Sequence, residues 1–167
     1  MPEDHLARYI VEVIDQLALS KLTGRYSRSG SAAYHPALLL ALLVYGYATG
    51  TFSSRKRERA THDSVAFRFI AANLHPDHDT LANFRKTFLV ELEDLFVQVL
   101  SYAQTMKLVK LGTISLDGTQ IKANASKHKA LSHGHIEKLE AQLREEVQAL
   151  LAKAAETDQQ EAGAEHD

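Results

Sequence analysis

The sequence predicts a mainly α-helical protein: a multi-helix N-terminal bundle, a short β-strand segment, and a C-terminal helix with an acidic, disordered tail. Three observations support this fold class. Apolar residues recur at helical spacing over most of residues 1–107, alternate at period two after Gly112, and return to helical spacing from about His135. The length of 167 residues fits one domain or one domain with an appendage.

In the first third of the chain we expect two helices separated by a loop. The first begins near Asp4, whose carboxylate can cap it, and presents one apolar face. The segment from Ser20 to Ser31 is polar and contains two glycines, which favours a loop. Pro36 suits the first turn of a second helix that runs to about Thr49. Because that helix is apolar on nearly every side, we expect it at the centre of the core.

Two short helices follow. Ser53 and Ser54 can cap a helix over 55–61, and Asp63 or Ser64 can cap the next one, whose packing face includes Val65, Phe67 and Ile70. Helices joined by short turns, one of them cationic, are compatible with a helix-turn-helix DNA reader, although many helical bundles share this outline. The cations of the first short helix lie in the run Arg55-Lys56-Arg57-Glu58-Arg59.

The segment 75–79 is predicted to be a turn in which Asp79 caps a long helix from Thr80 to about Lys107. Its His75 and His78 could suggest a metal site, but a capped turn without further ligands is favoured, so no metal is assigned.

Period-two alternation predicts strands over 113–117 and 119–123, turning at Asp117. That residue suits either an Asp-Gly hairpin turn or an Mg²⁺ ligand at a strand end. A helix is expected from about His135, and beyond Lys153 the Ala-, Glu- and Gln-rich composition predicts a disordered tail.

The net charge of −2 hides two oppositely charged parts. Residues 137–167 carry −6 and the remaining residues +4, with basic patches over 21–62 and 104–136. Such patches are typical of an anionic partner or of a solvated basic face. There is no cysteine, and no apolar run is long enough to cross a membrane, so we expect a soluble, cytoplasmic protein without a membrane partner.

Several short motifs carry a resemblance to a known family. They are Pro2 to Arg8, Tyr34-His35-Pro36, Tyr45 to Gly50, Ser53-Ser54-Arg55-Lys56, His75-Pro76-Asp77-His78, Phe84-Arg85 and Leu116 to Ser126. In this order, and up to about Leu151, the chain resembles the N-terminal portion of bacterial insertion-sequence DDE transposases with the InsH-type N-terminal domain.

The resemblance implies a DNA-binding helical domain over 1–111, the start of an RNase H-like catalytic domain over 112–126, and a helical insertion with an acidic tail over 127–167. In the family, two Asp and one Glu hold Mg²⁺ for DNA strand cleavage and transfer, and Asp117 matches the first Asp. The chain ends at Asp167, before the other two could appear. We therefore expect no cofactor and no catalysis from this fragment alone, and Mg²⁺ at Asp117 only if the missing carboxylates are supplied.

We predict that the chain binds the DNA ends of an insertion sequence. An alternative is a protein-interaction module that associates with a second copy or with full-length transposase, and a third is an inactive decayed product. For Arg85 a structural ion pair on the long helix is an equal alternative to DNA contact. The residues predicted to contact DNA are Arg28, Arg55, Lys56, Arg57, Arg59 and Arg85.

Overall fold

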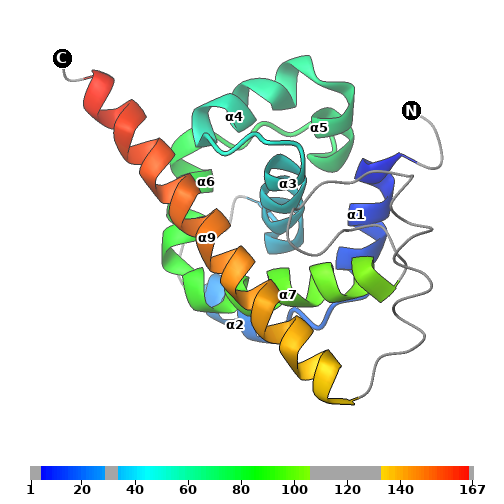
Figure 1. Cartoon of the computed structure of the whole chain (residues 1–167). Helices are drawn as coiled ribbons and strands as arrows, with labels where there is room; N and C mark the ends of the chain where they lie inside the picture. Colours follow the sequence, from blue (N-terminus) through cyan, green and yellow to red (C-terminus); the bar gives the residue numbers. More distant parts are fainter. Residues whose placement is uncertain (1–4, 29–33, 106–132, 166–167) are drawn as a thin grey trace.

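The computed structural model describes residues 5–28, 34–105 and 133–165, and these parts contain eight helices and no strand (Figure 1). The mainly α-helical prediction is confirmed for them. The predicted strands over 113–117 and 119–123 lie outside the described residues. The helices are α1 Leu6–Asp15, α2 Ser20–Arg28, α3 Pro36–Ala48, α4 Ser54–Asp63, α5 Val65–Ile70, α6 His78–Thr87, α7 Leu89–Thr105 and α9 His133–Glu165.

Helix α3 lies at the centre of the molecule, as predicted. Pro36 occupies its first turn, and the His35 side chain caps it by accepting a hydrogen bond from the Ala37 amide. Residues 39–47 are all buried. The helix packs against α1, α2, α5 and α6, so its apolar residues have a partner on every side.

Of the predicted caps of the two short helices, Ser53 and Ser64 are confirmed, whereas Ser54 is the first residue of α4 and Asp63 its last. The Ser53 hydroxyl accepts a hydrogen bond from the Lys56 amide at the start of α4, and the Ser64 hydroxyl accepts one from the Phe67 amide at the start of α5. Ser64 alone separates the two helices. At the start of α1 the cap is the His5 side chain and not the predicted Asp4, which lies outside the described residues.

The prediction of a loop from Ser20 to Ser31 is wrong for the part that the structure describes, because Ser20–Arg28 forms α2. The reason is tertiary packing. Leu22 is buried, and the ring of Tyr26, four residues later on the same face, packs against the rings of Phe84 and Phe88.

The predicted long helix over 80–107 is two helices, because the backbone leaves the helical conformation at Phe88. This break turns the Phe88 ring into the core, where it is buried beside Phe84. The cap of α6 is also different from the prediction. Asp77, and not Asp79, accepts the hydrogen bond from the Thr80 amide.

Helix α9 corrects the prediction of a disordered tail beyond Lys153, since it continues without interruption to Glu165. Figure 1 shows it as one long rod that crosses α7 and then passes α6. Its buried residues belong to the same hydrophobic core as the N-terminal helices. They are Leu143, Val147, Leu151 and Ala154.

Candidate nucleic-acid interface

The outward side of α4 presents two exposed cations. Lys56 and Arg59 lie three residues apart on the helix, so their side chains are neighbours on one face. Together with Ala60, Asp63 and Ser64 they line a shallow hollow. This face can approach an anionic surface without any rearrangement of the helices.

A groove runs along the other side of α4, between α4, α6 and α9. Half-buried Arg55 and exposed Lys86 contribute cations to its lining, while Asp79 and Asp158 contribute acids. The groove therefore combines two cations with two acids, whereas Lys56 and Arg59 share their hollow with one acid, Asp63.

Arg57 does not take part in either surface, and its predicted contact with DNA stays a prediction. Its side chain is 0% exposed. The guanidinium lies 4.9 Å from the centre of the Tyr47 ring, and its Nη2 donates a 2.7 Å hydrogen bond to the Phe52 carbonyl. Burial lowers its pKa, although Tyr47 and Asp158 oppose this effect. The Arg57 side chain can lie there because Gly46 has no side chain, since a Cβ at position 46 would come within 2.7 Å of Cδ of Arg57.

Arg85 is also buried, at 1% exposure, and its predicted contact with DNA stays a prediction. Its alternative role as a structural ion-pair partner is confirmed. Nη1 of Arg85 donates a 2.6 Å hydrogen bond to the Asp158 carboxylate. The partner, however, lies on α9 and not on the helix that carries Arg85.

Asp158 also binds the first residue of α4. Its carboxylate accepts hydrogen bonds from the Ser54 amide at 2.9 Å and from the Ser54 hydroxyl at 2.6 Å. Beside it, the Ser53 hydroxyl donates to Glu161 at 2.7 Å. Burial raises the pKa of Asp158, but the hydrogen bonds from Ser54 and Arg85 outweigh burial and leave it lowered.

Sequence reasoning missed these α9 acids. Asp158 and Glu161 lie in a segment whose composition is that of a solvated, acidic tail. The only signal that could have found them is the pair of serines at the start of α4, since free donors at a helix start favour acidic partners.

Two predicted site residues are not placed by the structure. Arg28 is the last residue of α2, but the structure does not place its side chain. Asp117 lies outside the described residues. Within 5–28, 34–105 and 133–165, no group of three or more His, Cys, Asp or Glu side chains could hold a metal ion. The Mg²⁺ site at Asp117 therefore stays a prediction.

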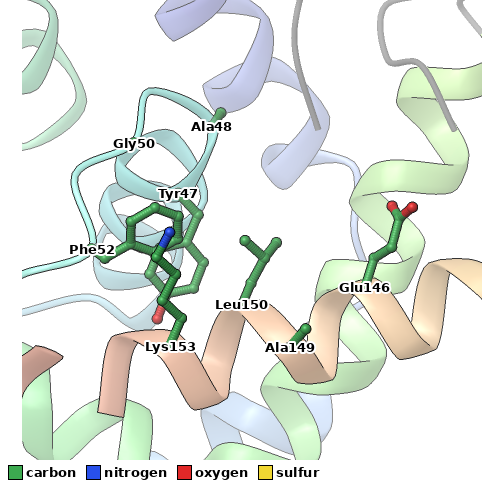
Figure 2. A pocket seen from close by; sticks show the side chains of 8 residues that line it. All are labelled: Tyr47, Ala48, Gly50, Phe52, Glu146, Ala149, Leu150 and Lys153. Carbon is green, nitrogen blue, oxygen red and sulfur yellow. The ribbon is translucent and has the colours of Figure 1, made fainter. Parts of the chain in front are cut away.

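A separate hollow lies between the end of α3 and the middle of α9 (Figure 2). The rings of Tyr47 and Phe52 stack there at a centroid distance of 5.6 Å, and the Lys153 ammonium lies 4.4 Å from the centre of the Phe52 ring. With one amine and the carboxylate of Glu146 as its charged groups, the hollow has no convergent polar set for a small molecule. Its lining is Tyr47, Ala48, Gly50, Phe52, Glu146, Ala149, Leu150 and Lys153.

No helix in the described part of the chain is both long and apolar enough to cross a membrane. In a comparison with known protein families, the model of a transposase domain (DUF772) matches residues 1–87, from the N-terminus through α6. No curated protein and no solved structure matches the chain. The match spans more than half of the sequence and confirms the predicted resemblance to the N-terminal portion of an insertion-sequence transposase. The chain therefore belongs to the transposase domain family (DUF772).

Proposed function

We propose that the chain binds the DNA ends of an insertion sequence, with the exposed face of α4 against the DNA backbone. The observation that carries this proposal is the position of Lys56 and Arg59. Both are exposed cations on one helix face, and that helix lies within the residues that match the transposase domain.

The chemistry of DNA supports this assignment. Lys and Arg side chains bind phosphate oxygens and release condensed counterions, which supplies affinity that does not depend on sequence. Half-buried Arg55, at the start of the same helix, adds a third positive charge nearby. On the basis of the sequence, the proposal also keeps Arg28 as a DNA contact and Asp117 as the first carboxylate of an incomplete catalytic set.

The proposal is tested by titrating the chain against a fluorescently labelled duplex of insertion-sequence end DNA at several salt concentrations. We expect the logarithm of the affinity to fall linearly with the logarithm of salt concentration. Lys56→Ala and Arg59→Ala should each reduce the slope by about 0.9, the value for one phosphate contact.

Lys138→Ala is the matched control, because it removes one exposed cation from α9 and leaves α4 unchanged. We expect its salt slope to equal that of the unmodified chain. Absence of binding at low salt, or an affinity that does not respond to salt, would reject the proposal. Equal effects of Lys56→Ala and Lys138→Ala would reject the assignment to α4.

A further inference from the structure

Two carboxylates of α9 accept hydrogen bonds from a set of donors that lie at the start of α4 and on the neighbouring helix α6. We call these donors, from Ser53, Ser54 and Arg85, the α4 socket. Asp158 accepts three hydrogen bonds in the socket, from the Ser54 amide, the Ser54 hydroxyl and the Arg85 guanidinium, and Glu161 accepts one from the Ser53 hydroxyl. A helix-start amide, two hydroxyls and a guanidinium are also the donors that proteins use to bind phosphate.

The socket holds one more hydrogen-bond donor than the carboxylates use. The buried Nη2 of Arg85 has no hydrogen-bond partner, whereas the Arg57 guanidinium binds the Phe52 carbonyl and lies against the Tyr47 ring. Nη1 of Arg85 donates to Asp158, so the buried Arg85 cation has one donor in use and one free in the socket. The two non-bridging oxygens of a DNA phosphodiester can accept hydrogen bonds from the donors that bind Asp158 and from Nη2 of Arg85.

The end of α9 is held over the socket by polar contacts. Apolar burial along α9 stops at Ala154, and none of the residues 155–164 is buried. Figure 1 shows this end of α9 projecting beyond the neighbouring helices. Because few apolar contacts must be broken, opening this end costs much less than unfolding the domain.

We propose that the α4 socket is a binding site for a DNA phosphate, and that Asp158 and Glu161 close it in the free chain. A phosphate of the bound duplex replaces the two carboxylates, and the last turns of α9 are released. This inference rests on the proposed DNA binding. It adds a regulatory role for α9, whose acids compete with DNA for the same donors.

The first test compares two variants that remove one negative charge each from the same half of α9. Glu161→Gln removes the charge of the carboxylate that accepts from the Ser53 hydroxyl, and it leaves the pair of Asp158 and Arg85 in place. Glu156 is exposed and lies outside the socket. We expect Glu161→Gln to bind end DNA about fivefold more tightly than Glu156→Gln, at the low end of typical coupling between two sites. Equal affinities would overturn the proposal, because bulk charge would then explain any gain.

The second test follows hydrogen exchange of the unmodified chain with end DNA, with inorganic phosphate, and with neither. We expect DNA to accelerate exchange in residues 155–165 by about tenfold and to slow it at the start of α4. The same change with inorganic phosphate alone would show that the socket accepts any phosphate. A DNA complex in which residues 155–165 remain as protected as in the free chain would overturn the proposal.

The outcomes separate this inference from the proposed function. If neither the unmodified chain nor Glu161→Gln binds DNA, both proposals fail. If DNA binds while residues 155–165 stay protected, only the closing role of α9 fails. Binding that appears only in Glu161→Gln supports both.

Discussion

Arg85 on α6 and Asp158 on α9 form a 2.6 Å ion pair between residues that are 73 positions apart in the sequence. The side chains are 1% and 13% exposed, so water is largely excluded from the pair. Removing one partner of such a pair leaves the other charge buried and uncompensated. The pair therefore ties the end of α9 to the N-terminal helices.

We expect Asp158→Asn to lower the free energy of unfolding by about 2 kcal/mol. This is less than the 3–5 kcal/mol for an enclosed ion pair, because opening the end of α9 lets water reach Arg85. Urea denaturation measures the loss. Glu156→Gln, an exposed neighbour on α9, should change stability by less than about 0.5 kcal/mol. Equal stability of the two variants would contradict a stabilising role for the pair.

The same carboxylate makes stability depend on pH. The pKa of Asp158 is lower in the folded chain than in the unfolded one, so the unfolded state takes up protons first as the pH falls. The stabilisation is complete above about pH 5 and is lost as the pH drops through the lowered pKa. Asp77, the cap of α6, also has a lowered pKa and contributes to the same window.

Denaturation at a series of pH values between about 2 and 7 measures this dependence. We expect Asp158→Asn to reduce the loss of stability on acidification. Among the described acids with a lowered pKa, Asp77 then remains to contribute. An unchanged slope in Asp158→Asn would show that other acids account for the acid sensitivity.

Local signals in the sequence were sufficient to predict the central helix α3 and the caps of α4 and α5. Pro36 at a helix start, an apolar run after it, and the caps Ser53 and Ser64 each act within a few residues. The cations of α4 were also found, since their positions follow from the run itself. A run of four cations does not show which of them the fold buries, and Arg57 is the one that packs under Tyr47.

Helix α2 and the ordered end of α9, which sequence reasoning missed, depend on contacts between distant segments. Helix α2 is ordered by the packing of Tyr26 on Phe84 and Phe88, far along the chain. The end of α9 is ordered by Asp158 and Glu161, which bind α4 and α6. A solvated acidic tail and an acidic helix with buried partners have the same local composition, so one sequence could not distinguish them.

Gly46 should not tolerate alanine, although it lies inside a helix where alanine is normally favourable. A Cβ at this position would lie 2.7 Å from Cδ of Arg57 and 2.9 Å from the Thr51 carbonyl oxygen. The backbone oxygen cannot move without shifting the turn after α3. We expect Gly46→Ala to destabilise the chain by about 1–3 kcal/mol in urea denaturation, as overpacked substitutions do.

Gly24→Ala is the matched control for this prediction, because no atom lies within 4 Å of its added Cβ in α2. It should leave stability unchanged or raise it by up to about 1 kcal/mol, through helix propensity and a smaller unfolded-state entropy. A Gly46→Ala variant as stable as Gly24→Ala would show that Arg57 has room to move.

The ion pairs between the first half of α9 and α7 should matter less than the apolar contacts beside them. Nη1 of Arg144 lies 3.1 Å from Glu93 and 2.7 Å from Asp94, but the Arg144 side chain is 43% exposed. We therefore expect Arg144→Ala to cost less than about 1 kcal/mol of unfolding free energy. The adjacent Leu143 is 2% exposed in the shared core, and Leu143→Ala should cost about 2–5 kcal/mol. Urea denaturation of both variants measures the difference, and a larger loss in Arg144→Ala would show that charge, and not apolar burial, holds α9 on α7.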